Sequence, residues 1–246
     1  MLNNEAEKYL DNIKVPANLL NNYVSQEIEN KFRVEKTTRR NDLKFTYGAN
    51  VEYAKYTNST FQKITTNNIV DTIDFSSDLD VWKYGLFSQV STALMQGKMI
   101  VSVGFRTDAA DFSKSTRNVF KQLSPRLSLS YAINKLIKWN GNVGVYYQLP
   151  AYTILGYRNK NLELVNQVNN VSYIRTKHFV TGLEYLTQTN LKVTLEGFYK
   201  YYDQYPFILR DSISLANLGS GFGVIGNTEV VSTSKGSSYG VELLAI

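Results

Sequence analysis

Strict alternation between hydrophobic and polar residues is the main pattern of this chain of 246 residues. It is clearest after Asn41, where Leu43, Phe45, Tyr47, Ala49, Val51 and Tyr53 alternate with Lys44, Thr46, Gly48, Asn50 and Glu52. A β-strand imposes a period of two, whereas an amphipathic helix repeats its apolar positions at intervals of three and four. The pattern therefore predicts strands with one hydrophobic and one polar face.

The alternation continues along the chain and predicts about nine strands within residues 23–246. They are expected at Tyr23–Thr37, Leu43–Tyr53, Val81–Met95, Lys98–Arg106, Arg126–Ile133, Trp139–Leu149, Lys177–Thr187, Leu191–Tyr202 and from Gly236 onward. Residues 1–22 contain Pro16 and are expected to form an irregular or short helical lead-in. The polar face of the strands mixes both signs of charge, as the surface of a soluble sandwich or the lumen of a wide barrel would.

The lengths of the connections alternate as well. Short connections are expected at Thr38–Asn41, Gln96–Gly97, Asn134–Lys138 and Gln188–Asn190, and long ones at Ser59–Leu79, Thr107–Gln122, Pro150–Thr176 and Asp203–Ser234. All tight turns then lie at one end of the sheet, as in outer-membrane barrels. Trp82 and Trp139 share the parity of the apolar residues near opposite ends, which fits two aromatic girdles or, alternatively, the core of a sandwich.

Composition narrows the class of protein. Aromatic residues make up 13% of the chain, mean hydropathy is −0.26, and there is no cysteine, which excludes disulfides and thiolate metal sites. The charge-free stretch from Trp139 to Tyr157 is interrupted by polar residues and cannot form a transmembrane helix. The 27 basic and 21 acidic side chains are spread along the chain, so no nucleic-acid partner is predicted.

Several segments resemble a known family. They are Ser124–Tyr131 (SPRLSLSY), Tyr146–Tyr152 (YYQLPAY), Leu155–Arg158 (LGYR), Glu196–Lys200 (EGFYK), Tyr205–Phe207 (YPF) and Lys235–Glu242 (KGSSYGVE). Together they resemble the barrel of TonB-dependent outer-membrane receptors, in particular those of Bacteroidetes-type bacteria. The resemblance implies an all-β, antiparallel, up-and-down transmembrane β-barrel in the bacterial outer membrane.

The resemblance also implies a function. Such receptors take up siderophores, cobalamin, glycans or peptides, and their barrel of about 22 strands encloses an amino-terminal plug with a TonB-binding box. We expect this sequence to be an incomplete barrel without the plug, whose partners are outer-membrane lipid, an extracellular solute and TonB through the plug and box. No enzymatic activity and no cofactor are expected. The alternative is a soluble β-sheet module that binds carbohydrate; needing detergent to stay in solution would distinguish the barrel.

Candidate ligand-binding residues are aromatic, amide and guanidinium side chains close to the long connections: Tyr146, Gln148, Tyr152, Tyr157, Arg158, Tyr205, Phe207 and Arg210. Aromatic faces and guanidinium groups suit flat or anionic solutes, although packing of the connections on each other is the commoner explanation for any one of these residues. A calcium site is conceivable at Asp71, Asp74, Asp78 and Asp80, beside the solvated acidic loop that is the simpler explanation.

Two other features predict no chemistry. His178 is the single histidine and has no partner pattern for a catalytic triad. Gly221–Gly226 matches a dinucleotide-binding fingerprint literally, but it lacks the flanking strand and helix which that fingerprint needs.

Overall fold

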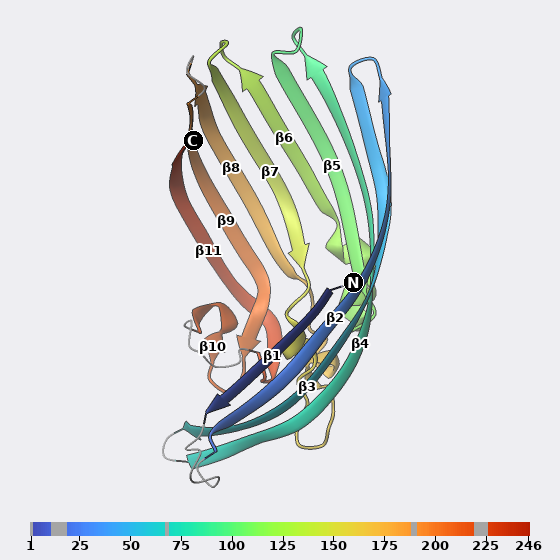
Figure 1. Ribbon diagram of the computed structural model, residues 1–246, viewed down its shortest axis with the longest axis vertical. Coiled ribbons are helices and arrows are strands. Elements are labelled where there is room, and N and C mark those ends of the chain that lie inside the picture. The colour runs from blue at the N-terminus through green and yellow to red at the C-terminus, as the bar shows by residue number, and fades with distance from the viewer. Residues whose placement is uncertain (1, 11–18, 67–68, 188–190, 219–225) are drawn as a thin grey trace.

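The computed structural model describes residues 2–10, 19–66, 69–187, 191–218 and 226–246, in which a single antiparallel sheet contains eleven strands (Figure 1). The elements are β1 (Leu2–Leu10), β2 (Asn21–Arg40), β3 (Leu43–Thr66), β4 (Ile69–Leu94), β5 (Met99–Ala110), α1 (Lys114–Arg117), η2 (Val119–Gln122), β6 (Ser124–Ala132), β7 (Ile137–Gln148), α2 (Tyr152–Leu155), α3 (Val165–Val168), β8 (Ile174–Leu186), β9 (Lys192–Ile208), β10 (Ile213–Ser214), η3 (Leu215–Asn217) and β11 (Val230–Ala245).

Each strand from β1 to β9 pairs with the next one in the chain, and β10 and β11 both pair with β9. The order is therefore up-and-down, as predicted, and within the described residues β1 and β11 remain unpaired edges, so the sheet is open. None of the described helices is long and apolar enough to cross a membrane.

The β2–β3, β4–β5 and β6–β7 turns lie at one end of the sheet, the upper end in Figure 1. The β4–β5 turn places Met95, Gln96 and Gly97 at positive φ and closes with a hydrogen bond from Gly97 N to Leu94 O of 3.0 Å. In the β6–β7 turn, Asn134 Oδ1 accepts hydrogen bonds from the backbone amides of Leu136 and Ile137. The β2–β3 turn falls at Asn41, which confirms the predicted asymmetry for these three turns; residues 188–190, the fourth, lie outside the described residues.

The two faces of the sheet differ in polarity where the strands approach the tight turns. One outward row consists of residues that pair directly across neighbouring strands, and each is at least 40% exposed: Phe45, Val90, Val103, Leu127, Val143, Phe179, Tyr199 and Tyr239. We call these eight residues the apolar belt. The belt is not covered by a second sheet in the described part of the chain, which excludes the sandwich alternative.

The β3–β4 hairpin differs from the sequence-based expectation. Residues 59–79 were predicted to be a loop, but β3 and β4 extend to Thr66 and from Ile69. The reason is that the polarity of the two faces inverts in this half: Lys55 and Asp78 face outward and pair with each other, whereas Tyr56 and Leu79 face inward and are buried. An alternation that changes its phase does not read as one continuous amphipathic strand.

The aromatic girdle residues lie at opposite ends of the outward face. Trp82 contacts Tyr53 with ring centroids 5.0 Å apart, at the point where the polarity inverts. Trp139 lies near the tight turns and donates a hydrogen bond to Thr181 Oγ1. From Trp82 to the end of β4 at Leu94 the strand rises about 28 Å along the membrane normal at the usual tilt, close to the height of the apolar band of outer-membrane barrels.

Three further expectations about elements are wrong. Leu2–Leu10 forms a strand instead of an irregular or short helical lead-in, because it pairs with β2 along nine residues and this pairing overrides local preference. The Thr107–Gln122 connection begins later, since β5 extends to Ala110. The segment after Tyr202 was expected to be a loop up to Ser234, but β9 extends to Ile208, where its pairing with β11 passes through irregular register near Ser234. Residues 219–225, which include most of the glycine-rich segment, lie outside the described residues.

Candidate functional site

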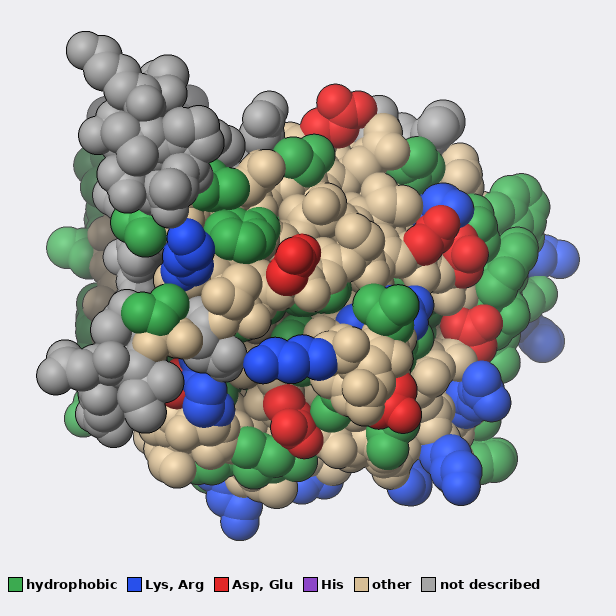
Figure 2. Space-filling model, turned by 90° about the horizontal axis from the view of Figure 1, so that it is seen from below, with side chains coloured by type: hydrophobic (Ala, Val, Ile, Leu, Met, Phe, Trp, Pro, Cys, Tyr) green, Lys and Arg blue, Asp and Glu red, His purple; other side chains and the backbone are tan. Residues whose placement is uncertain are grey.

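The β7–β8 connection folds onto the inward face of the sheet, which we define as the face opposite the apolar belt. Its helix α2 buries Ile154 and Leu155 in one hydrophobic cluster with Tyr56, Leu79 and Val81 of the β3–β4 hairpin. Viewed from the end of the long connections, the middle of the molecule shows backbone and uncharged polar side chains with scattered charged and hydrophobic ones, and hydrophobic side chains gather along one side (Figure 2). Burial of this kind contributes about 1.5–3 kcal/mol for each large side chain.

Asn166 of α3 links the β7–β8 connection to the segment that leads into β11. Its side chain is fully buried and its Nδ2 donates hydrogen bonds to the carbonyl oxygens of Ile154 and Thr228, at 2.7 and 3.0 Å. Its Oδ1 accepts a hydrogen bond of 2.9 Å from Val230 N at the start of β11. The amide thus joins the connection to the last strand of the sheet.

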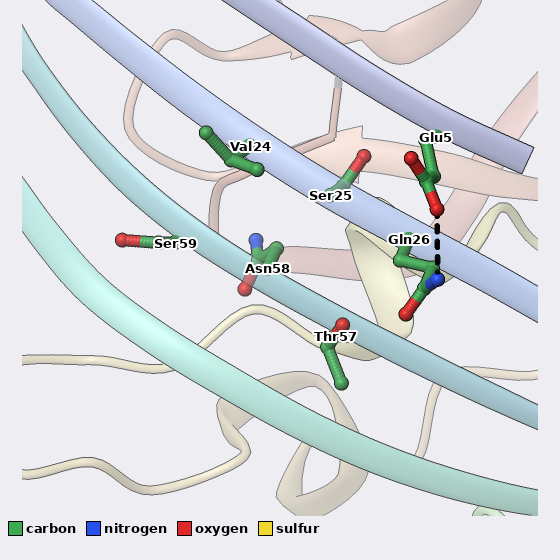
Figure 3. A pocket seen from close by; sticks show the side chains of 7 residues that line it. All are labelled: Glu5, Val24, Ser25, Gln26, Thr57, Asn58 and Ser59. Carbon is green, nitrogen blue, oxygen red and sulfur yellow. Dashed lines mark hydrogen bonds between the residues drawn. The ribbon is translucent and has the colours of Figure 1, made fainter.

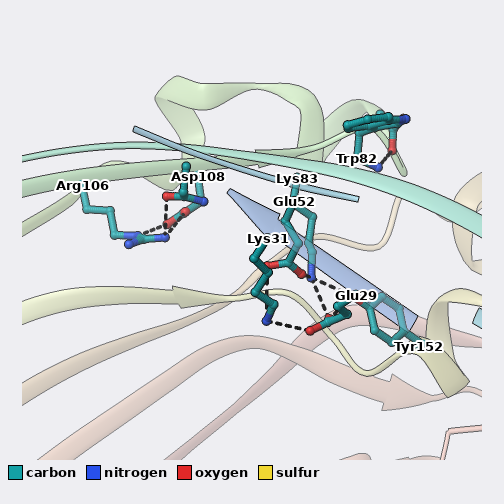
Figure 4. Close-up of polar contacts among 10 residues, drawn as sticks. Glu29, Lys31, Glu52, Trp82, Lys83, Arg106, Asp108 and Tyr152 are labelled. Atoms are coloured by element: carbon teal, nitrogen blue, oxygen red, sulfur yellow. Dashed lines mark hydrogen bonds and ion pairs between the residues drawn. The ribbon is translucent and has the colours of Figure 1, made fainter. Parts of the chain in front are cut away.

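A group of charged residues lies beside Tyr152 (Figure 4). Lys83 Nζ on β4 pairs with the carboxylates of Glu29 on β2 and Glu52 on β3, and Lys31 pairs with the same two carboxylates at 2.6 and 3.3 Å. Strand register explains the arrangement, because Lys31, Glu52 and Lys83 are direct cross-strand partners. We call Glu29, Lys31, Glu52 and Lys83 the paired cluster.

Tyr152 caps the paired cluster from the connection. Its hydroxyl donates a hydrogen bond of 2.6 Å to Glu29 Oε1 and accepts one of 2.7 Å from Lys83 Nζ. Burial raises the pKa of Tyr152, and the hydrogen bond to Glu29 raises that pKa further, so the hydroxyl stays protonated as a donor. Tyr152 therefore fixes the connection on the wall of the sheet.

Tyr157 and Arg158 hold the next part of the same connection. The Tyr157 ring meets Phe75 edge-on at a centroid distance of 5.5 Å. Arg158 donates hydrogen bonds to Leu162 O and Asp78 O, at 2.7 and 3.3 Å. Tyr152, Tyr157 and Arg158 thus pack the connection against strands β2 to β4, which agrees with the packing interpretation of these positions.

Tyr146 and Gln148 share the inward parity of β7. The Tyr146 ring lies between Arg126 and His178, 4.4 Å from the guanidinium carbon of Arg126 and 4.4 Å from the centroid of His178. Gln148 is exposed at the end of the strand. Lys200 lies directly opposite His178 on the next strand. Sequence reasoning missed Arg126 and Lys200 in this group because cross-strand register could not be read from the chain.

The remaining candidates divide between a groove and the surface. Tyr205 meets the Tyr202 ring edge-on and lines a cavity of about 370 Å³ with Lys235 and residues of η3. Gln204 at positive φ places Tyr205 beside Tyr202, an arrangement invisible in the sequence. Phe207 pairs with β10 and β11, and Arg210 forms an exposed ion pair with Asp211 that lowers the pKa of the Asp211 carboxyl.

The aspartates of the conceivable calcium site do not converge in the described residues. Asp78 and Asp80 occupy successive positions on the outward face of β4. Asp78 pairs with Lys55, and Asp80 accepts a hydrogen bond of 2.6 Å from Tyr53. Asp74 is exposed further along the same strand, and the side chain of Asp71 lies outside the described residues. No group of three or more potential metal ligands occurs in the part of the chain that the structure describes.

A cavity of about 630 Å³ lies across β1, β2 and β3 (Figure 3). Gln26 Nε2 donates a hydrogen bond of 3.0 Å to Glu5 across it. The rest of its lining is Val24, Ser25, Thr57, Asn58 and Ser59, which offers no charged or aromatic group to a solute.

Comparisons with known proteins agree with the architecture. The chain resembles the copper transporter OprC, with 15% identity and a TM-score of 0.64 over 99% of this chain and 40% of that one. It also resembles the ferric enterobactin receptor of Pseudomonas aeruginosa, with 17% identity and a TM-score of 0.63 over 94% and 34% of the two chains. A third similar structure is the pyoverdine receptor FpvA of P. aeruginosa PAO1, with 11% identity and a TM-score of 0.61 over 98% of this chain and 37% of that one.

These likenesses concern the fold, and the chain spans well under half the length of each of these proteins. No protein with a curated description matches the sequence. The family model of the TonB-dependent receptor-like β-barrel matches residues 4–245. The chain therefore belongs to the TonB-dependent receptor β-barrel family, whose members lie in the outer membrane of Gram-negative bacteria.

Proposed function

We propose that this chain forms part of the barrel wall of a receptor that takes up a solute across the outer membrane with energy supplied through TonB. The supporting observation is the two-faced sheet: the apolar belt is exposed on one face, and the other carries ion pairs, aromatic rings and a docked connection. Such a sheet suits lipid on its outer side and a polar path or plug on its inner side.

The similar proteins support an uptake function of this kind, since they are described as a copper transporter and as receptors for ferric enterobactin and pyoverdine. The solute of this chain belongs to the wider set of siderophores, cobalamin, glycans and peptides. Tyr146, Gln148 and Tyr205 are the candidates for direct contact with it. Tyr152, Tyr157 and Arg158 act by positioning the β7–β8 connection.

The test compares depletion of solutes from the growth medium by three strains: wild type, one lacking the receptor and one lacking TonB. We expect at least one solute to be depleted more slowly in both deletion strains, with no further loss when the deletions are combined. The proposal fails if the receptor deletion slows the uptake of a solute whose uptake does not depend on TonB, or slows no uptake at all.

A further inference from the structure

A group of basic residues lies on the inward face across four neighbouring strands. Arg126 on β6 is directly opposite Gly144 on β7, Gly144 is opposite His178 on β8, and His178 is opposite Lys200 on β9. All three basic side chains are half-buried. We call Arg126, His178 and Lys200 the basic row.

Several other inward cations have carboxylate partners, and in the part of the chain that the structure describes the basic row has none. Lys31, Arg33, Lys83, Arg106, Lys138 and Lys192 each form an ion pair with a carboxylate. Within the described residues, Arg126, His178 and Lys200 form none. Arg126 Nε is in addition excluded from solvent without a hydrogen-bond acceptor. A guanidinium nitrogen in that state costs free energy unless an acceptor from outside the described residues reaches it.

The surroundings hold the side chains of the basic row in place without pairing them with a carboxylate. The Tyr146 ring lies against Arg126 and His178, and Lys200 Nζ lies 4.8 Å from the centroid of the Phe198 ring. Gly144 provides the space for this stack, because a Cβ atom there would lie 3.2 Å from Arg126 Cγ and 3.0 Å from Tyr146 Cε2. Aromatic faces stabilise cations while leaving their N–H groups available to an anion.

We propose that the basic row is a binding site for an oxyanion, a carboxylate or phosphate-type group, presented to the inward face of the sheet. The terminal N–H groups of a planar guanidinium and an ammonium on the same face are the donors that bind such groups with charge-assisted hydrogen bonds. The inference rests on the proposed function only in that the inward face must line the lumen. The oxyanion comes either from a solute or from a side chain of another part of the receptor.

The first arm of the test titrates inorganic phosphate into the purified full-length receptor in detergent, with calorimetry as the readout. We expect Arg126→Gln and Lys200→Gln each to weaken binding at least about tenfold, the loss expected for one charge-assisted hydrogen bond. Lys177→Gln is the matched control, because Lys177 lies next to His178 on β8 but faces outward near Tyr201. Gly144→Ala should weaken binding without altering charge.

The second arm measures the melting temperature of the same variants and distinguishes the sources. If the oxyanion is a side chain of the receptor, phosphate does not bind to the wild type, and Arg126→Gln and Lys200→Gln melt at lower temperature than Lys177→Gln. If the row has no anion, removing a cation relieves repulsion and the melting temperature rises or stays unchanged. Absence of phosphate binding together with that result overturns the inference. Binding is measured independently of uptake, so failure of the proposed function would be seen separately.

Discussion

The contact of Tyr152 with the paired cluster should control how firmly the β7–β8 connection is held. Tyr152→Phe removes one hydroxyl that donates to Glu29 and accepts from Lys83, while the ring can keep its place against Tyr56 at a centroid distance of 6.0 Å. Both partners are charged, and the carboxylate and ammonium keep each other at 3.1 Å. We therefore expect a net loss of about 2 kcal/mol, near the middle of the range for hydrogen bonds to charged groups.

Amide hydrogen exchange of the full-length receptor measures this loss directly. The amides of Leu155 and Gly156 donate to the carbonyls of Ala151 and Tyr152, so they exchange only when α2 opens. A loss of about 2 kcal/mol should raise their exchange rate about 30-fold. Amides of β9 should be unaffected.

Tyr173→Phe is the matched control for that experiment. Tyr173 is a buried tyrosine of the same connection, and burial raises its pKa, but its hydroxyl has no hydrogen-bond partner among the described residues. The Tyr173→Phe substitution should leave hydrogen exchange of the α2 amides nearly unchanged. Equal acceleration in both variants, or none in Tyr152→Phe, would refute the idea that the paired cluster anchors the connection.

Three further predictions concern other parts of the sheet. Leu127→Arg in the apolar belt should destabilise the receptor in phospholipid vesicles by about 2–4 kcal/mol in urea titrations, whereas Ser128→Arg on the inward face should cost far less. Asn166→Ala leaves the Val230 amide and two carbonyls without their partner and should speed tryptic cleavage after Lys160 well beyond the rate in Asn161→Ala; equal rates would contradict this role. Arg175→Lys replaces a two-pronged contact with the buried Asp203 by a single one and should lower stability by about 1–2 kcal/mol, measured as the urea midpoint; an unchanged midpoint would count against it.

Local periodicity made much of the sheet predictable. The face on which Leu127, Val143 and Phe179 lie follows from a period of two, which needs no knowledge of neighbouring strands. The tight turns were recognisable for the same reason, since they interrupt that period over a few polar residues. Family membership was likewise predictable, because the segments from Ser124 to Glu242 carry the resemblance. The narrower Bacteroidetes-type assignment stays a prediction.

The arrangement of the candidate site depends on contacts that no local pattern encodes. Tyr152 and Glu29 are 123 residues apart in the chain, and Asn166 and Val230 are 64 apart. Arg126 and Lys200 are brought to one row by register across three strand pairs, each of which could have been shifted by two residues without changing the alternation. Tyr146 was named from its type and parity, and its basic neighbours were missed for this reason.

The inversion of polarity along the β3–β4 hairpin explains why the connection docks where it does. Toward the tight turns the outward side chains are hydrophobic, so the inward face can be polar and the sheet still separates lipid from water. Beyond Tyr53 and Trp82 the outward side chains are Lys55, Asp78 and Asp80, which suit water. The inward face of that half is then free to be apolar, and it buries Tyr56 and Leu79 under α2.

The paired cluster lies at the boundary between the two halves, where a half-buried polar surface meets the apolar cluster and every charge needs a partner. Anchoring the connection there ties it to the part of the hairpin that extends beyond the apolar belt, and leaves the wall around Tyr146 and the basic row open to whatever occupies the lumen.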